Sequence, residues 1–330
     1  MTTKRTLLLG SAEAADLESA ASLLMSGALV AIPTETVYGL AADASNDDAV
    51  RAIFAAKGRP KSHPLIVHVA DAAHARRLSR AWSAAAEILA RSFWPGPLSI
   101  LTTRADSVSN VVTGGRDTVV LRVPAQSATL RILRLLHEQG SIGVAAPSAN
   151  RFGSISPTTA SHVLADLDGR IDAVVDGGPC SVGVESTIVD CTHEPAIVLR
   201  PGGVPIEHIA SCLAEHGLTV AMSPDVAGTI DESRAIAPGM LRSHYAPRTR
   251  LVVVESDDEV EDVRRTAEAR GERVVLLPHP ADVYEYSRDL YALLRGCDEA
   301  GADLIVGSLP SSVGLGAAVR DRLLKAAAER

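Results

Sequence analysis

The chain has 330 residues and a formal charge of −8, with 32 Lys and Arg against 40 Asp and Glu. Hydrophobic residues make up 46% and charged residues 22%, which excludes disordered, collagen-like and low-complexity proteins. The charge is uneven, because residues 51–150 carry 13 basic and 5 acidic residues, a local +8. An acidic chain with one basic segment favours a compact anionic ligand over a long polyanion.

Neither a membrane anchor nor a cysteine-based scaffold is expected. No run of 18 apolar residues occurs, and the apolar run Leu7–Leu9 is too short for the core of a secretory signal. A cytoplasmic protein is therefore predicted. The cysteines lie far apart, without a CxxC pair, and we expect ordinary thiols at Cys180, Cys191, Cys212 and Cys297.

In chain order, the first part of the sequence mixes helical and strand-like periodicity. Helices are predicted at residues 12–26, 48–57, 71–80, 83–92, 127–138, 158–166 and 206–214. Strands are predicted at residues 28–32, 64–70, 98–103, 118–123, 142–146, 172–176, 187–191 and 196–200. Because the two kinds of element do not alternate strictly, we expect an α/β (α+β) fold with a mixed sheet.

The composition changes after residue 215. Gly, Pro, Ser and Arg dominate residues 222–250, which predicts a linker or functional loop. Beyond it, strands at 251–255, 273–277 and 303–306 alternate with helices at 257–270, 284–296 and 316–329. This alternation predicts a small domain with a parallel sheet. We therefore divide the chain into a catalytic domain at 1–216, a linker at 217–250 and a C-terminal domain at 251–330.

A basic motif, Lys57-Gly58-Arg59-Pro60, ends the predicted helix at 48–57, and His63 follows it. One interpretation is a helix end capped by glycine, with cations that suit the helix dipole. The other is an anion clamp, because Arg59 can hold a phosphate through two nitrogens and Lys57 can add a point charge.

Two further side chains lie on predicted strands. Thr118, Val120 and Arg122 share one face by the two-residue period of a strand. A buried arginine in an apolar strand is costly unless an anion meets it, so Arg122 is a ligand candidate. His68 lies in the apolar run 65–69, where a lone histidine is more often a satisfied core group than a ligand.

Several strand ends carry small polar groups. These are residues 33–40 (PTETVYGL), 145–150 (AAPSAN) with Ser156 and Thr158, 183–187 (GVEST) and 200–202 (RPG). Residues 33–40 could be a turn or could offer hydroxyls and a carboxylate to a ligand. The loop from 145 to 158 could bind phosphate or ribose oxygens, or Ser156 or Thr158 could simply cap the next helix. Walker, GxGxxG, GxSxG and HExxH patterns do not occur. The remaining residue types suit positioning and electrostatic stabilisation of a phosphoryl group, without a protein nucleophile.

The ordered motifs PTETVYGL, KGRP, PLIVHV, WPGPL, TVVLRVP, APSAN, SPT, ESTIVD, LRPG and HYAP resemble the YrdC-like family over nearly the whole chain. The resemblance is to its long form, the threonylcarbamoyl-AMP synthases with a C-terminal domain. It implies a YrdC-like twisted sheet joined to a small Rossmann-like domain. It also implies condensation of L-threonine, bicarbonate and ATP into threonylcarbamoyl-AMP and pyrophosphate. A separate tRNA threonylcarbamoyl transferase machinery would then modify adenosine 37 of tRNA.

The resemblance also implies residue roles. The catalytic pairs of the family match Lys57 with Arg59 and Ser148 with Asn150. Threonine would be bound by Thr36, His68, Arg122, the backbone of Ala146, and Ser186. ATP would be bound by Arg59, His63, Thr118, Ser148, Ser156, Arg200 and Tyr245. Mg2+ is expected on the ATP phosphates, with no metal ligand from the protein, and the linker is expected to close over the site as a lid.

Two alternatives stay open at this point. The basic segment 51–150 permits a YrdC-like protein that binds double-stranded RNA without synthase activity, or a synthase with weak RNA contact. A relative that makes carbamoyl-AMP for hydrogenase maturation is disfavoured. Such chains carry zinc-finger cysteine pairs and an acylphosphatase module, which this sequence lacks.

Overall fold

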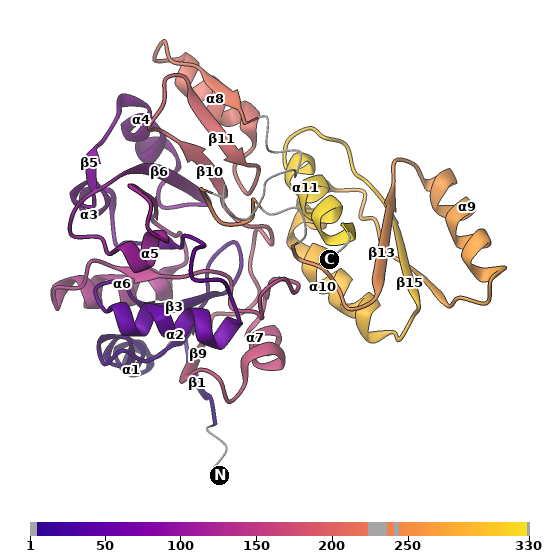
Figure 1. Ribbon diagram of the computed structural model, residues 1–330, viewed down its shortest axis with the longest axis horizontal. Helices are drawn as coiled ribbons and strands as arrows, with labels where there is room; N and C mark the ends of the chain where they lie inside the picture. Colours follow the sequence, from indigo (N-terminus) through magenta and orange to yellow (C-terminus); the bar gives the residue numbers. More distant parts are fainter. Residues whose placement is uncertain (1–4, 224–235, 241–243, 329–330) are drawn as a thin grey trace.

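The computed structural model describes residues 5–223, 236–240 and 244–328, which form a large first domain and a smaller second one (Figure 1). Within these ranges, no helix combines the length and apolar character needed to cross a membrane. The strands of the first domain are β1 (Leu7–Gly10), β2 (Val30–Ile32), β3 (Gly39–Asp43), β4 (Ile66–His68), β5 (Ser79–Ala81), β6 (Leu98–Arg104), β7 (Thr118–Arg122), β8 (Val144–Ala145), β9 (Ala173–Asp176), β10 (Thr187–Asp190), β11 (Ala196–Arg200) and β12 (Val220–Met222).

These strands form one twisted sheet in the order β1-β9-β2-β3-β8-β4-β7-β6-β10-β11-β12, with β5 beside β6. Parallel pairs such as β4 with β7 neighbour antiparallel pairs such as β6 with β7, so the predicted mixed sheet is confirmed. The parallel β4–β7 register places His68 beside Arg122. Two candidate ligand residues predicted separately from the sequence therefore end neighbouring strands.

The helices of the first domain are α1 (Ala14–Met25), α2 (Asp47–Lys57), α3 (Ala72–Arg77), α4 (Ala84–Phe93), α5 (Asn110–Thr113), α6 (Ser127–Glu138), α7 (Ala160–Leu167) and α8 (Ile206–Ala214). Helix α2 begins where the Asn46 side chain accepts hydrogen bonds from two backbone N–H groups of the first turn. It ends at Gly58, whose φ of 67° lies in the left-handed region that glycine tolerates. This termination turns the chain so that Arg59 leaves the helix axis.

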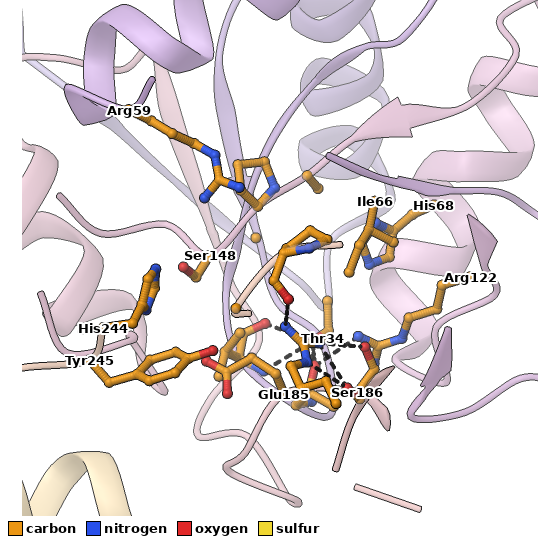
Figure 2. Close-up of a pocket in the computed structure, with 18 residues that line it drawn as sticks. Thr34, Arg59, Ile66, His68, Arg122, Ser148, Glu185, Ser186, His244 and Tyr245 are labelled. Carbon is orange, nitrogen blue, oxygen red and sulfur yellow. Dashed lines mark hydrogen bonds between the residues drawn. The ribbon is translucent and has the colours of Figure 1, made fainter. Parts of the chain in front are cut away.

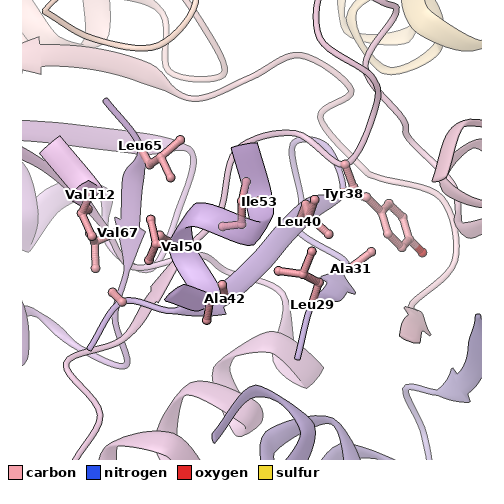
Figure 3. Close-up of a cluster of buried hydrophobic side chains, with 14 of the residues drawn as sticks. Leu29, Ala31, Tyr38, Leu40, Ala42, Val50, Ile53, Leu65, Val67 and Val112 are labelled. Carbon is pink, nitrogen blue, oxygen red and sulfur yellow. The ribbon is translucent and has the colours of Figure 1, made fainter. Parts of the chain in front are cut away.

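Aliphatic residues fill the core on both faces of the sheet, and alternation along the strands sorts them. In β2, Ala31 packs in the cluster that contains Val50 and Ile53 of α2 (Figure 3). Its neighbours Val30 and Ile32 pack on the opposite face, where α1 and α6 lie. Burying each of these larger side chains contributes about 1.5–3 kcal/mol, so this packing fixes the strand ends that carry the polar motifs.

Four short strands or helices, β1, β3, β5 and α5, were not predicted, and β12 falls in the expected linker. Strand β3 reads Gly-Leu-Ala-Ala-Asp, which has no β-branched residue, yet it lies between β2 and β8 with every residue buried. Strand β12 pairs with β11 and so extends the first sheet. Residues 220–222 of the predicted linker therefore pair with the sheet of the first domain.

The second domain matches its predicted alternation. Its elements are β13 (Arg250–Val254), α9 (Asp257–Glu268), β14 (Val274–Leu276), α10 (Val283–Glu299), β15 (Leu304–Ser308) and α11 (Gly316–Ala327). The three strands form a parallel sheet in the order β13-β15-β14. Helix α9 lies on one side of this sheet, while α10 and α11 lie on the side that faces the first domain (Figure 1).

The two domains pack closely where α10 meets the loop before β10. Ser287 Oγ donates to the Val182 carbonyl at 2.6 Å, and Arg295 donates to the Ile155 carbonyl at 2.6 Å. A Cβ placed on Gly183 would lie 2.3 Å from backbone carbonyls of α10, so glycine permits this approach. The second domain is thereby seated directly beside the loop that leads to Ser186.

Candidate functional site

A cavity opens where polar strand ends of the first domain meet (Figure 2). Strands β4, β7 and β11 end in His68, Arg122 and Arg200, which all line it. Loops after β2 and β8 contribute Thr36 and Ser148. Ligand sites commonly lie at such strand ends, because the sheet holds the groups rigidly while the loops vary.

The cavity brings together most of the predicted site residues. Its wall includes Thr36, Arg59, His68, Arg122, Ala146, Ser148, Ser186, Arg200 and Tyr245. His63 lines a second, smaller space, and Arg59 and His244 line both. Figure 2 shows His68 and Arg122 on one side of the main cavity and Arg59, Ser148 and His244 on the other. The two predicted sets meet at Arg200, whose Nη2 donates to the Ser186 carbonyl at 2.7 Å, while His68 and Arg59 lie on opposite sides of the cavity.

Lys57 does not reach this cavity. Its ammonium donates to the carbonyls of Ser148 at 2.6 Å and Asn150 at 2.5 Å. Burial and the nearby Arg59 guanidinium lower the pKa of Lys57 well below its ordinary value. In this structure the ammonium holds the 148–150 loop against α2, and a role of Lys57 toward the ligand stays a prediction.

Three other predicted residues also lie outside the cavity wall. The Asn150 amide donates to the carbonyls of Arg151 and Ser154, which fixes the same loop. Ser156 Oγ donates to Glu185 Oε1 at 2.7 Å. Thr118 lies at the opposite end of β7 from Arg122.

Arg122 is buried as predicted, but the anion that meets it belongs to the protein. Its Nη2 donates to Glu35 Oε1 at 2.6 Å and its Nη1 to Thr36 Oγ1 at 2.9 Å. Its Nε donates to the Gly96 carbonyl at 3.2 Å. A guanidinium has five N–H groups, so this pairing leaves donor capacity toward the cavity while keeping the charge compensated.

Several buried nitrogen atoms at the two spaces have no hydrogen-bond partner within the described part of the chain. They are Arg59 Nε, His63 Nε2, His68 Nδ1 and His244 Nδ1. A buried polar group without a partner costs about 1–3 kcal/mol, so such atoms are rare in structures unless something else binds them. Arg59, His68 and His244 line the main cavity, and the convergence of their unpartnered nitrogens there is the strongest structural sign of a polar ligand site.

Burial also sets the charge of these groups. It lowers the pKa of His68 to about 3 and that of His63 to about 4, so both imidazoles are neutral at pH 7. It lowers the pKa of Arg59 to about 10, which leaves that side chain charged. The arginines therefore provide positive charge, and the imidazoles provide neutral hydrogen-bonding groups.

Sequence reasoning singled out the segments of Glu185 and His244 without assigning either residue a role, yet both line the cavity. Tyr245, the next residue, has a φ of 64°, an uncommon value for a residue other than glycine. Its ring stacks on Tyr291 of α10 with ring centres 5.8 Å apart. The second domain thus contributes to the conformation of the cavity wall, which no local motif could indicate.

A protein-held metal ion has no evident ligand set here. Among the residues that the structure describes, no three His, Cys, Asp or Glu side chains form a possible metal site. Glu185 is the one carboxylate in the described wall of the main cavity, and both its oxygens accept hydrogen bonds from protein groups.

Comparisons with known proteins cover both domains. The family described as "Telomere recombination" matches residues 22–202, and the family described as "Threonylcarbamoyl-AMP synthase, C-terminal domain" matches residues 204–328. The threonylcarbamoyl-AMP synthase of Pyrococcus abyssi is 40% identical over 328 residues, spanning 94% of each chain. This chain belongs to the threonylcarbamoyl-AMP synthase family.

Other members of the threonylcarbamoyl-AMP synthase family agree with this assignment. The Bacillus subtilis synthase is 38% identical, with 94% of this chain and 92% of that one covered. The crystal structure of Pyrococcus abyssi Sua5 complexed with L-threonine has a TM-score of 0.90, with 98% of this chain and 97% of that one covered at 38% identity. The predicted family, fold class and enzyme class are confirmed.

Proposed function

We propose that this chain condenses L-threonine, bicarbonate and ATP into L-threonylcarbamoyladenylate and pyrophosphate in the cavity at the strand ends. The observation that carries the proposal is the convergence of unpartnered buried nitrogens and three arginines on that cavity. Such a wall suits a zwitterionic amino acid beside a triphosphate, because it offers both charge and directed hydrogen bonds.

Threonine is proposed to bind at the end formed by Thr36, His68, Arg122 and Ser186, with the Ala146 backbone. The free N–H capacity of Arg122 suits a carboxylate, and the unpartnered His68 Nδ1 suits a hydroxyl or amine. ATP is proposed to lie at the other end, toward Arg59, His63, Ser148, Arg200 and Tyr245. Ser156 and Thr118 support that end indirectly, and Lys57 and Asn150 shape its loop.

In the proposed reaction, the threonine amine adds to bicarbonate-derived CO2 and loses a proton to give a carbamate. The carbamate oxygen then attacks the α-phosphate, the bond to the β-phosphate breaks, and pyrophosphate leaves. Two anions then approach each other, so Arg59 and Arg200 are assigned to neutralise the charge that develops on the phosphates. Mg2+ is proposed to arrive on the phosphates of ATP and to supply positive charge there, without a protein ligand. No residue of the chain becomes covalently modified.

The linker is proposed to act as a lid. Its described residues Pro238, Gly239, His244 and Tyr245 line the cavity, which supports a role in excluding water from a hydrolysable product. The boundaries 1–216, 217–250 and 251–330 remain our prediction apart from β12. We further propose a cytoplasmic location, delivery of the product to a tRNA threonylcarbamoyl transferase, and at most weak direct contact with RNA.

The decisive experiment incubates the pure chain with ATP, Mg2+, labelled bicarbonate and L-threonine, and measures pyrophosphate together with labelled adenylate. Both should form only when all substrates are present. Pyrophosphate release that is independent of threonine would overturn the proposal. The RNA-binding alternative is measured in the same preparation with a labelled RNA duplex, and duplex binding without threonine-dependent pyrophosphate would favour it.

A further inference from the structure

A buried polar cluster joins the two domains at the edge of the cavity. The Glu185 carboxylate from the first domain accepts from Arg322 Nε of α11 at 2.7 Å and from the Tyr291 hydroxyl of α10 at 2.8 Å. Ser156 Oγ completes the set at 2.7 Å. The Arg322 side chain is 0% exposed and that of Glu185 9% exposed, so this ion pair is shielded from water. Charges interact far more strongly there than at a surface.

Glu185 is an unexpected wall residue for a site that takes a triphosphate. It is the one acidic residue in the described wall of the main cavity, where Arg59, Arg122 and Arg200 also lie. A carboxylate without a cation would repel phosphate oxygens across the cavity. A role as a general base is disfavoured, because both of its oxygens accept hydrogen bonds and the pairing with Arg322 lowers its pKa to about 2.

Arg322 is held in place by several groups besides Glu185. Its Nη2 donates to the Pro201 carbonyl at 3.0 Å, its Nη1 pairs with Asp321, and its guanidinium lies 5.2 Å from the centre of the Tyr245 ring. It therefore contacts the Glu185 loop, the segment after β11 and the linker at once. A side chain fixed in this way provides a compensating charge at a constant position.

Helix α11 also binds the linker on both sides of residues 241–243. Lys325 Nζ donates to the Gly239 carbonyl at 2.7 Å, and the Lys325 carbonyl accepts from the His244 backbone N–H at 3.2 Å. Gly239 and His244 both line the cavity. A shift of helix α11 would therefore move the linker residues that line the proposed ATP end of the cavity.

We propose that Arg322 is a positioning residue for ATP, which neutralises Glu185 so that the cavity wall carries no uncompensated negative charge beside the phosphates. Without Arg322, the buried carboxylate repels the triphosphate. This inference rests on the proposed function, because it takes ATP to bind at this cavity. It assigns the second domain a charge-compensating role in substrate binding.

The test is a charge cycle measured by pyrophosphate release and by calorimetric binding of MgATP. Arg322→Gln should raise the KM for ATP at least about tenfold, since breaking a buried pair leaves an uncompensated charge. The KM for threonine should change much less. Adding Glu185→Gln to that variant should restore most of the ATP affinity, because the repelling charge is then gone. A purely structural role for Arg322 would not produce this recovery.

Matched variants keep the result interpretable. Arg320→Gln lies on the same helix and pairs with the exposed Glu255, so it should leave the KM for ATP unchanged. Tyr291→Phe removes the hydrogen bond to Glu185 without changing the charge, so it should raise the KM for ATP only a few-fold. If Arg322→Gln does not fold, Tyr291→Phe takes its place in the test. An unchanged KM for ATP in a folded Arg322→Gln, or no recovery in the double variant, overturns this inference alone. Failure of the wild type to bind MgATP overturns it together with the proposed function.

Discussion

Polar side chains gather at strand ends in both domains, yet the two regions differ in how those side chains are satisfied. In the second domain, Ser308 at the end of β15 donates to Asp257 at 2.6 Å and contacts His279 Nδ1 at 2.7 Å. In the first domain, buried nitrogens of Arg59 and His68 face a cavity without partners. Polar strand ends alone therefore do not identify a ligand site.

Single unpartnered atoms are not sufficient either. Buried atoms of His74 and Tyr286 also lack partners in the described structure, and neither residue lines the main cavity. What distinguishes the first-domain site is that several such atoms converge with arginines on one space. The predictions below test whether that convergence, and not polarity at a strand end, determines activity.

The largest effect is expected for Arg59→Ala. Among the residues that the structure describes, Arg59 makes one hydrogen bond, to the Pro64 carbonyl, so its other N–H groups are proposed to contact the triphosphate. Loss of a charged contact of about 1.5–3 kcal/mol corresponds to roughly a 10- to 150-fold lower kcat/KM for ATP. Arg51→Ala is the matched control, because Arg51 is an exposed residue of α2 that pairs with Asp47 and Asp48. Equal kinetics of the two variants would remove Arg59 from the site.

A smaller and more selective effect is expected for His68→Ala. The neutral imidazole offers one hydrogen bond to threonine, so its loss should raise the KM for threonine roughly 2- to 10-fold. The KM for ATP should move less, because His68 lies at the other end of the cavity. His216→Ala, an exposed residue of the same type, provides the control. An effect on ATP alone would contradict the division of the cavity into two ends.

The buried imidazoles also predict a pH dependence of stability. The pKa of His68 falls from 6.5 to about 3 on folding, so the unfolded chain takes up the proton first. The stabilisation is complete above pH 6.5 and is lost as the pH falls below it, by about 1.4 kcal/mol per pH unit for each such group. Urea unfolding at pH 7, 6 and 5 should show a shallower loss in His68→Ala than in wild type. Parallel pH profiles would mean that His68 is not buried in its neutral form.

The smallest kinetic effect is expected at the strand end of the second domain. Ser308→Ala removes contacts with Asp257 and His279 and should lower the free energy of unfolding by about 1–2 kcal/mol. Its KM values should equal those of wild type. A changed KM for threonine or for ATP would mean that this edge of the second domain also contributes to catalysis. The two regions would then not differ in the way described above.

The sequence could predict elements whose own periodicity identifies them. Helix α6 was predicted at its observed bounds, because apolar residues repeat along it at helical spacing. Strand β3 could not be predicted in this way. Its glycine and alanines have weak strand preference, and only burial between neighbouring strands makes them a strand.

The site residues also fall into those that local patterns could predict and those that they could not. Arg59 and Arg122 were found from local patterns, a helix end and a strand face. The partners of Glu185 were not, because Tyr291 and Arg322 are separated from it by 106 and 137 positions. The motif of Lys57 was recognised from the sequence, but the two loop carbonyls that its ammonium contacts could not be predicted from that motif.

The position of α11 has a consequence for how the protein is made. Residues 316–327 are translated after every other described element, yet they supply Arg322 to the wall at Glu185 and hold the linker at Gly239. In a nascent chain that has not yet reached residue 316, the Glu185 carboxylate would therefore lack its arginine partner and the linker would lack its contact at Gly239. The wall of the pocket depends on residues that are synthesised long after the strands that carry it.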